Sequence, residues 1–349
     1  MPLVQYLTHW LPDKGLNGSF SRIEKPSIST NTWFNGEFQK RSRWHYRDHI
    51  GHRSLLVRTY NQWVYSLYKI PRAKHVITGP ENILYSDLYT KTLQGKDYLG
   101  KQIIKQRIDH LEKLGNLLEK KGSHLVLFQA PGKAWFYQDL LTEFPKADST
   151  NYEVFSEILK TRDLNYFDCQ ELFMNMKDTC SYPLFPKNGV HWSNYGFHLA
   201  LDSFGIFLNQ ALGYNLPELE IVEIEVSKHP KFTDQDIEDG MNLLFDLPEP
   251  SLAYPKIRFR EGGNKPKALI IGDSFVWGPW NHGLFAGYFE QPEFWFYNRS
   301  AYLDGKGRVE RDFKNSAEIL KEFDLIIILT TDAKLESMPW GLLENLSIK

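Results

Sequence analysis

The chain has 349 residues, 42% of them hydrophobic and 15% aromatic, and its formal net charge at pH 7 is -2. This composition is enough for a large hydrophobic core, in one large domain or in a domain with additions. Because Lys, Arg, Asp and Glu are mixed over the chain as a whole, the charge predicts no basic surface and argues against a nucleic-acid partner.

Membrane spans and export signals are not expected from this sequence. No stretch approaches the ~20 apolar residues that cross a bilayer, and residues 1–6 lack the basic and then apolar layout of a signal peptide. The two cysteines, Cys169 and Cys180, leave two alternatives open, a disulfide or two free thiols. Their spacing is not typical of a metal site, and we predict neither a metal nor an organic cofactor.

The first part of the chain predicts an irregular entry and then a helix. Residues 1–30 are rich in Pro and Gly and predict an irregular N-terminal segment, and we expect residues 31–349 to form a single domain. Apolar residues at near-helical spacing predict a helix packed by its aromatic face; they are Leu55, Leu56, Tyr60, Trp63, Val64 and Leu67. Asp48 is expected to cap this helix or to pair near its start.

The middle of the chain alternates helices and strands. Residues 76–85 predict a hairpin, because Gly-Pro-Glu-Asn separates two apolar runs. Further along, a helix is predicted at 100–121 with a strand at 125–128, and a second helix at 151–161 with a strand at 164–167. A helix at about 195–211 follows. The polar stretch at about 216–266 is interpreted as an excursion from the domain.

The last third of the chain completes the predicted sheet. Apolar runs predict strands at 267–271, 294–298 and 325–329, with a helix at 314–322. Strands that alternate with amphipathic helices are typical of an α/β domain with a mainly parallel central sheet. In such domains the loops at the carboxyl ends of the strands hold the functional site.

The apolar run Lys267-Ala-Leu-Ile-Ile-Gly-Asp-Ser274-Phe predicts a buried strand that ends at a serine. Gly272 permits a sharp turn there, and Asp273 is expected to hold that turn through backbone hydrogen bonds. A serine hydroxyl is a weak nucleophile and needs a base within hydrogen-bond distance. Among the 11 histidines, His191 is the candidate, because Pro, Gly and aromatic residues bound its loop.

These two motifs, Ile-Gly-Asp-Ser-Phe and His-Trp-Ser, resemble those of the SGNH-hydrolase-like alginate O-acetyltransferase family, of the AlgX and AlgJ type. The similarity extends over about residues 30–335. It includes the Trp33–Arg53 stretch, Tyr60-Asn-Gln, Ala130-Pro-Gly-Lys-Ala and Phe167-Asp168. The resemblance implies a three-layer SGNH-hydrolase-like fold, a histidine that precedes the serine in the chain, Ser274 as nucleophile and His191 as general base.

The chain departs from this family at one position. The family pattern is Asp-x-His-Trp, and Gly189 stands where the family has its acid. A triad acid holds the tautomer of the imidazole and stabilises its cation. Three alternatives remain open: another group such as Asn188 or a carboxylate or carbonyl from elsewhere supplies this contact, the enzyme works as a Ser-His dyad, or the site binds without turnover.

Other residues are candidates for stabilising an oxyanion or holding a sugar. The backbone amide of Ser274 is one expected oxyanion donor, and Asn298, Arg299 and Tyr302 are candidates for the second. Lys133 is a candidate for binding a sugar hydroxyl or carboxylate, against the alternative of a surface ion pair. The indoles that flank the two motifs are candidates for stacking on sugars, against the alternative of core packing; they are Trp192, Trp277 and Trp280.

Together these residues predict a serine acyltransferase or acetylesterase without a cofactor. The resemblance implies a polysaccharide or oligosaccharide partner, an acetyl donor that is a protein or a small molecule, membrane-complex partners, and a periplasmic or extracytoplasmic location. The alternative from another class is a non-catalytic carbohydrate-binding subunit of a polysaccharide-modifying complex, which Gly189 favours. A lipase-like esterase lacks support, since the sequence predicts no long apolar acyl groove.

Overall fold

The computed structural model describes residues 14–18 and 24–346. The chain divides into two compact units. The first comprises residues 1–78 and 236–248, and the second comprises residues 79–235 and 249–349. Most of the predicted irregular segment, residues 1–30, lies outside the described residues, and α2 begins at Thr30. Residues 31–78, which the sequence analysis assigned to the single domain, lie in the first unit.

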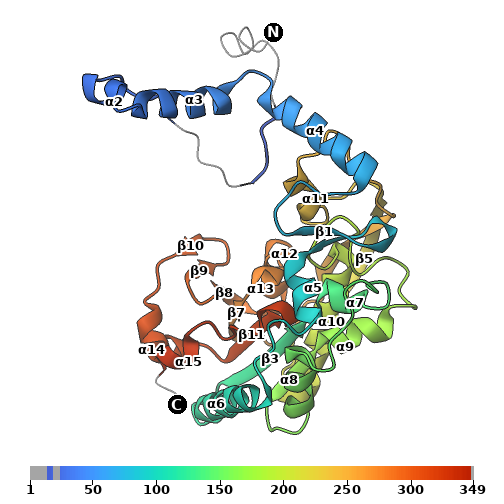
Figure 1. Ribbon diagram of the computed structural model, residues 1–349. Coiled ribbons are helices and arrows are strands. Elements are labelled where there is room, and N and C mark those ends of the chain that lie inside the picture. Colours follow the sequence, from blue (N-terminus) through green and yellow to red (C-terminus); the bar gives the residue numbers. More distant parts are fainter. Residues whose placement is uncertain (1–13, 19–23, 347–349) are drawn as a thin grey trace. The chain divides into compact units, whose positions relative to one another are not determined.

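The secondary structure alternates helices and strands through the second unit (Figure 1). The strands are β1 (Val76–Thr78), β2 (Leu84–Ser86), β3 (His124–Ala130), β4 (Asn165–Asp168), β5 (Leu219–Ser227), β6 (Leu252–Phe259), β7 (Lys267–Gly272), β8 (Glu290–Phe296), β9 (Ser300–Leu303), β10 (Gly307–Val309) and β11 (Leu325–Thr331). The helices are α2 (Thr30–Phe34), α3 (Glu37–His49), α4 (Arg53–Tyr68), α5 (Asp87–Leu93), α6 (Lys101–Glu119), α7 (Lys133–Phe136), α8 (Asn151–Leu159), α9 (Cys169–Met176), α10 (Asn194–Leu212), α11 (Asp236–Met241), α12 (Trp277–Asn281), α13 (Leu284–Tyr288), α14 (Ser316–Ile319) and α15 (Leu342–Asn345).

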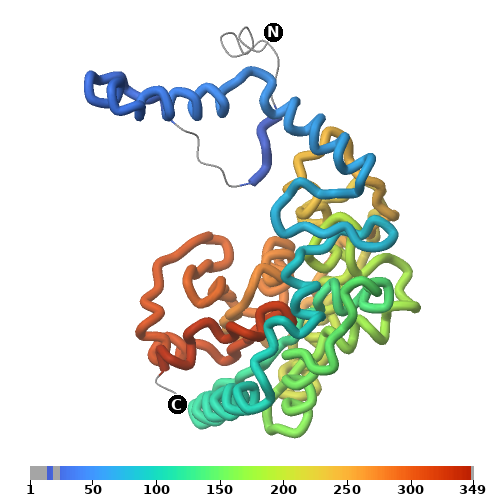
Figure 2. Tube along the Cα trace, in the orientation of Figure 1, coloured from blue at the N-terminus to red at the C-terminus, as the bar shows by residue number. Residues whose placement is uncertain are grey.

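A seven-stranded sheet organises the second unit, in the order β10-β9-β8-β7-β11-β3-β4. The five strands from β8 to β4 in this order are parallel, and β9 and β10 extend the β8 edge in antiparallel fashion. Figure 2 traces this order from orange β7 and β8 through red β11 to teal β3. The prediction of a mainly parallel sheet is confirmed.

Helices cover both faces of this sheet. Neighbouring residues of a strand point to opposite faces. On β3, Leu125 lies next to Gly115 of α6, whereas the ring of Phe128 contacts that of Phe204 on α10 at 4.8 Å. Helices α6 and α10 therefore lie on opposite faces, which makes the unit a three-layer α/β domain.

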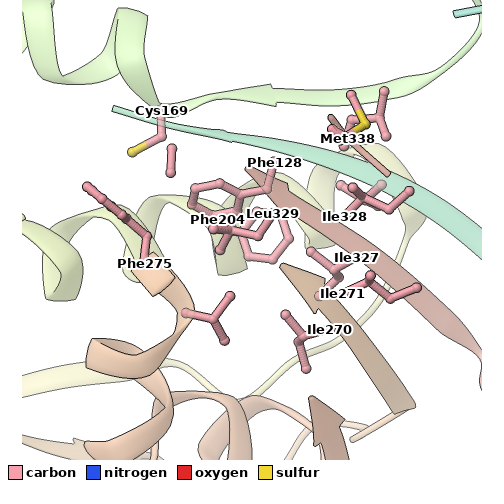
Figure 3. Close-up of a cluster of buried hydrophobic side chains, with 14 of the residues drawn as sticks. Phe128, Cys169, Phe204, Ile270, Ile271, Phe275, Ile327, Ile328, Leu329 and Met338 are labelled. Carbon is pink, nitrogen blue, oxygen red and sulfur yellow. The ribbon is translucent and has the colours of Figure 1, made fainter. Parts of the chain in front are cut away.

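The central strands are buried along their whole length. Every residue of β11 is buried, as are the five from Ala268 to Gly272 on β7. Such apolar runs, without alternation, are typical of parallel strands covered on both faces. Figure 3 shows isoleucines of β7 and β11 in one cluster with the rings of Phe128, Phe204 and Phe275. Phe275, the residue that follows Ser274, is part of this core.

Two helices with a predicted apolar face differ in the structure. Helix α6 buries its apolar residues Ile104, Ile108 and Leu111, as predicted. Helix α4 does not pack by its predicted aromatic face, so that part of the prediction is wrong, because Tyr60 and Trp63 are exposed. Its buried residues are Ser54, Arg58, Asn61, Val64 and Tyr65, and the side chains of Arg58 and Asn61 donate to backbone carbonyl oxygens there.

The structure also bears on the predictions for Asp48, for the polar stretch at 216–266 and for the two cysteines. Asp48 pairs with Arg53 at 3.8 Å near the start of α4, as predicted. The polar stretch at 216–266 contains an antiparallel pair, β5 and β6. Cys169 and Cys180 are free thiols, which decides between the two alternatives for the cysteines. Within residues 14–18 and 24–346, no helix is both long and apolar enough to cross a membrane.

Candidate active site

Ser274 begins a short 3-10 helix, Ser274–Val276, directly after β7. The turn is close packed, because a Cβ on Gly272 would lie 2.5 Å from a methyl of Val276 and 2.9 Å from the carbonyl oxygen of Leu329. Asp273 is buried, and its carboxylate accepts hydrogen bonds from the Phe275 amide at 2.9 Å and the Thr331 amide at 2.8 Å. The prediction that Asp273 holds this turn is confirmed.

The structure brings the two predicted catalytic side chains together. The Nε2 atom of His191 lies 2.9 Å from the Oγ atom of Ser274, although 83 residues separate them in the chain. The imidazole also packs on the Phe275 ring, with a centroid distance of 4.9 Å. A serine hydroxyl within hydrogen-bond distance of a histidine nitrogen is the arrangement that allows proton transfer from nucleophile to base. The pair can therefore perform nucleophilic chemistry on an ester.

The loop that carries His191 is held by two buried charged groups from elsewhere in the chain. The Nζ atom of Lys133, at the start of α7, donates to the carbonyl oxygens of Leu84 at 2.8 Å, Lys187 at 2.9 Å and Gly189 at 2.6 Å. The carboxylate of Glu249 accepts from the backbone amides of Lys187 at 2.7 Å and Asn188 at 3.1 Å. Burial raises the pKa of Glu249, while these amides and the Lys133 charge oppose the rise.

Gly189 is packed against another part of the backbone. A Cβ at this position would lie 2.8 Å from the carbonyl oxygen of Asp234 and 2.9 Å from its carbonyl carbon. Contacts this short between a side chain and a backbone carbonyl do not occur in a relaxed structure. The backbone at Asp234 therefore fills the space in which an aspartate side chain at position 189 would begin, which gives a physical reason for the glycine.

Tyr297 is a site residue that the sequence analysis did not select. It follows β8, and its amide donates to the carbonyl oxygen of Gly272 at 2.9 Å, which places it next to the Ser274 turn. Burial raises the pKa of Tyr297 to about 12, the Asp273 charge adds to the rise, and hydrogen bonding from the Ser274 hydroxyl and backbone opposes it. At neutral pH the Tyr297 hydroxyl is therefore a protonated donor beside the nucleophile.

The backbone around Tyr297 is unusual. Tyr297 and Asn298 both have positive φ, 50° and 53°, and such left-handed residues other than glycine cluster at functional sites. Sequence reasoning reached the run Tyr297–Tyr302 but chose its other polar members. Tyr297 is identified by the hydrogen bond from its amide to Gly272 at the end of β7. This contact depends on β8 lying beside β7, which the local sequence does not show.

The three predicted candidates for the second oxyanion donor make other contacts. Asn298 is buried, and its Nδ2 atom donates to the carbonyl oxygen of Trp340 at 3.1 Å. Arg299 is exposed. Tyr302 lies on β9 and packs its ring against Trp277 at 4.8 Å. None of these contacts involves Ser274, and a catalytic role for the three residues stays a prediction.

Two of the predicted sugar-binding residues are buried, so these assignments need correction. Lys133 is 1% exposed and its ammonium is bound by three carbonyl oxygens, so it positions the His191 loop instead of binding a substrate. Trp192 is also 1% exposed and lies among Phe128, Phe173 and Phe275. Trp277 is half-buried, and its outer part remains a candidate for stacking on a sugar.

Asn188, which the sequence offered as a replacement for the missing acid, is almost completely buried next to Gly189. The backbone amide of Asn188 donates to the carboxylate of Glu249. A role of Asn188 in orienting His191 stays a prediction. Across the part of the chain that the structure describes, no group of three or more His, Cys, Asp or Glu side chains is arranged to hold a metal ion.

Comparison with known proteins adds a family and a fold. Residues 76–231 match the family model described as "SGNH hydrolase-like domain, acetyltransferase AlgX". This match includes His191 and ends before Ser274. No curated protein sequence is significantly similar to the chain.

Two solved bacterial structures are similar to the chain in fold. The O-acetyltransferase domain of Pseudomonas putida AlgJ is similar with a TM-score of 0.53 and 17% sequence identity, over 78% of this chain and 99% of that one. Bacillus cereus PatB1 with a sulfonyl adduct is similar with a TM-score of 0.50 and 11% identity, over 74% of this chain and 97% of that one. At these identities the likeness is one of fold.

Proposed function

We propose that this protein moves acetyl groups through a covalent ester on Ser274, because residues 76–231 match the model of the SGNH hydrolase-like acetyltransferase family of AlgX. The observation that supports this most strongly is the 2.9 Å contact between His191 Nε2 and Ser274 Oγ. The same pair supports either of two outcomes, transfer to a sugar hydroxyl or hydrolysis by water, depending on which acceptor reaches the acyl-enzyme first.

In the first half of the reaction, Ser274 Oγ attacks the carbonyl carbon of an acetyl ester while His191 Nε2 takes the hydroxyl proton. The carbonyl oxygen becomes an oxyanion. The Ser274 amide and the Tyr297 hydroxyl are the donors that we assign to it, since preorganised donors at developing charge lower the barrier most. The C–O bond to the donor breaks, and His191 returns its proton to the leaving alkoxide.

In the second half, His191 Nε2 removes a proton from the acceptor hydroxyl, and that oxygen attacks the acetyl carbon on Ser274. The same donors stabilise the second oxyanion. The ester bond to Ser274 Oγ then breaks, and His191 returns the proton to the serine. The cycle ends with an acetylated acceptor and the original hydroxyl, and it requires no oxidant, reductant or metal.

We propose a polysaccharide hydroxyl as the acceptor and an extracytoplasmic compartment as the location. AlgX and AlgJ, the names attached to the matching family and to one similar fold, are acetyltransferases, and the family model supports O-acetylation as the reaction class. The half-buried ring of Trp277, on the helix that follows the Ser274 turn, offers an apolar face to a sugar.

The missing acid at position 189 also has a proposed replacement. The chain that fills its place carries a carboxylate at Asp234, which is buried. We expect Asp234→Asn to lower kcat by about 10²- to 10⁴-fold with little change in KM, as loss of an orienting acid does. If this variant matches wild type, Asp234 does not orient His191.

The test of the function is an acetyl-transfer assay with 4-nitrophenyl acetate, with and without an oligosaccharide acceptor. We expect wild type to release nitrophenol and to acetylate the sugar, and Ser274→Ala and His191→Ala to lose at least about 10³-fold in rate. Ser193→Ala is a matched control, since Ser193 caps α10 close in sequence to His191 but lies outside the proposed chemistry.

One result would replace this proposal with another function. If wild type and Ser274→Ala release nitrophenol at the same rate while both bind the oligosaccharide equally, the acyl-enzyme proposal fails. The protein would then be a non-catalytic carbohydrate-binding subunit that keeps the fold of the family.

A further inference from the structure

Helix α4 buries polar side chains beside Val64 and Tyr65 and exposes a row of apolar ones. A surface helix normally buries an apolar stripe and exposes polar residues. On α4 the buried side carries Arg58, whose guanidinium donates to the carbonyl oxygens of Leu243 at 2.9 Å and Gly15 at 2.8 Å, and Asn61, which donates to that of Met241 at 2.8 Å. These bonds fix which side of the helix faces outward.

The outward side is an apolar stripe, by which we mean Leu56, Tyr60, Trp63 and Leu67. Their spacing of four, three and four residues places them on one face of the helix. Each is at least half exposed, with Leu56 at 56%, Trp63 at 57% and Leu67 at 58%. Isolated exposed apolar residues are normal, but an unbroken stripe over three helical turns marks an interaction surface.

One more ring extends this surface within the same unit. The backbone amide of Phe245 donates to the side-chain oxygen of Gln62 at 3.0 Å, next to Trp63 in the helix. The Phe245 side chain is 67% exposed. The segment that satisfies the polar side of α4 therefore also presents an aromatic side chain to solvent.

The charges around the stripe are predominantly positive. Residues 25–74 contain ten Lys or Arg and two acidic residues, whereas the whole chain has 41 and 43. Both acidic residues pair with arginines, Glu37 with Arg41 at 3.7 Å and Asp48 with Arg53 at 3.8 Å. The near-neutral net charge of the whole chain therefore does not describe residues 25–74, which are basic.

A cation lies at the stripe itself. The guanidinium of Arg72 is 5.6 Å from the centre of the Tyr60 ring. Helix α4 itself contains no Asp or Glu. Tyr and Trp bordered by Lys and Arg are typical of segments at the boundary between lipid headgroups and acyl chains, where rings enter the apolar region and cations meet phosphate.

We propose that the apolar stripe of α4 docks on an anionic lipid bilayer, with Leu56, Tyr60, Trp63 and Leu67 in the interface and the basic residues of 25–74 other than the buried Arg58 on the headgroup phosphates. The helix lies on the surface and does not cross the membrane. A protein partner is less favoured, because a stable interface buries ~800 Å² per partner and this stripe is one side chain wide. This inference does not depend on the acetyl-transfer chemistry.

The test is sedimentation of the full chain with vesicles of phosphatidylcholine alone or with phosphatidylglycerol. We expect binding to the anionic vesicles, at least tenfold weaker binding to neutral ones, and further loss in high salt, because exposed charges are screened. The double variant Tyr60→Ser, Trp63→Ser is expected to lose at least tenfold in partition.

The matched control is Leu117→Ser, Ile206→Ser, which removes two exposed apolar side chains from the other unit. It is expected to bind like wild type. The activity of both double variants towards an acetyl ester should equal that of wild type, which separates a failure of docking from a failure of the proposed chemistry or of folding.

Three results would overturn the proposal. They are an absence of binding to any vesicle, equal binding by wild type and the Tyr60→Ser, Trp63→Ser variant, and a dimer in solution that this variant abolishes. The last result would assign the stripe to a second copy of the chain.

Discussion

The Ser274 turn and the His191 loop meet at 2.9 Å but are stabilised in different ways. The turn is built mostly from its own strand and from β11 beside it, through Asp273 and the close packing at Gly272. The loop has no regular structure, and buried charges on Lys133 and Glu249 hold its backbone. The nucleophile is thus positioned by the end of a strand and its neighbour in the sheet, and the base by two buried side chains that hold an irregular loop.

This difference predicts that substitutions in the two regions affect stability and activity differently. A change at a remote support of the loop should affect stability and activity together, whereas a change at the turn can affect chemistry alone. The four predictions that follow are ordered by the expected size of their effects.

The substitution Lys133→Met is expected to have the largest effect. It keeps the length of the side chain but leaves the carbonyl oxygens of Leu84, Lys187 and Gly189 without their buried donor. The free energy of unfolding should fall by about 4 kcal/mol, with a parallel loss of activity, since an unsatisfied buried group costs ~1–3 kcal/mol. Urea denaturation measures this fall.

The control for this prediction is Lys187→Met in the same loop. Its ammonium is partly exposed and pairs with Glu81 at 3.9 Å, so we expect a change below about 0.5 kcal/mol. Equal effects of the two substitutions would show that Lys133 does not hold the loop, and the contrast between loop and turn would disappear.

The substitution Tyr297→Phe is expected to affect chemistry alone. It removes the hydroxyl beside Ser274 and keeps the ring, so kcat should fall by about 10²-fold while the unfolding midpoint stays within error. Steady-state kinetics on an acetyl ester measure the loss. A matched control is Tyr302→Phe, whose ring packs on Trp277; if it loses as much as Tyr297→Phe, the oxyanion role belongs to neither hydroxyl uniquely.

The substitution Gly189→Ala tests how tightly the His191 loop is packed. The new methyl would lie 2.8 Å from the Asp234 carbonyl oxygen, so the loop or the chain at Asp234 must shift. We expect a loss of about 2 kcal/mol in stability, as for other overpacked sites, and lower activity because His191 moves with the loop. Gly240→Ala is the control, since its Cβ would meet nothing within 4 Å. An unchanged Gly189→Ala protein would contradict the packing argument.

The smallest effect concerns Asp332, which lies next to residues that support both regions. Asp332 follows Thr331, which binds Asp273, and its carboxylate lies where a Cβ of Gly132 would be, just before Lys133. Burial raises the pKa of Asp332 from 3.8 to about 7, the Ala333 amide opposes the rise, and the Asp97 and Asp273 charges add to it. At neutral pH this buried carboxyl is close to its midpoint.

The sign of its effect on stability follows from the raised pKa. The folded state holds the proton more tightly than the unfolded state, so this contribution is complete below about pH 4 and is lost as the pH rises through about 7. Relative to wild type, the stability of Asp332→Asn should rise between pH 4 and pH 8. Urea midpoints at the two pH values check this, and a constant difference between the proteins would show that Asp332 does not titrate.

The difference between a strand end and an irregular loop also explains what the sequence could predict. Strands β3, β7 and β11 are recognisable because a buried parallel strand is a short apolar run, and α6 because its leucines and isoleucines recur every three to four residues. Ser274 is recognisable because its turn follows directly from its strand. His191 is a candidate because of the residues that bound its loop, and the resemblance to a family supports its pairing with Ser274.

The rest depends on contacts that no local pattern contains. Lys133 was assigned to a substrate because nothing in its neighbourhood indicates that three carbonyl oxygens surround it. Tyr297 was passed over because its position depends on β8 lying beside β7. On α4 the pattern indicated the apolar face correctly, but the direction of that face depends on carbonyl oxygens at 241 and 243.

The most direct test of the central claim is the covalent state of Ser274. Wild type is mixed with an acetyl ester, quenched in acid within one turnover, digested and analysed by mass spectrometry. The account predicts one acetyl group on the peptide that contains Ser274 in wild type, and none on that peptide in Ser274→Ala or His191→Ala. Turnover of the ester by wild type without an acetyl group on Ser274, or acetylation of that peptide to the same extent in His191→Ala, would contradict it.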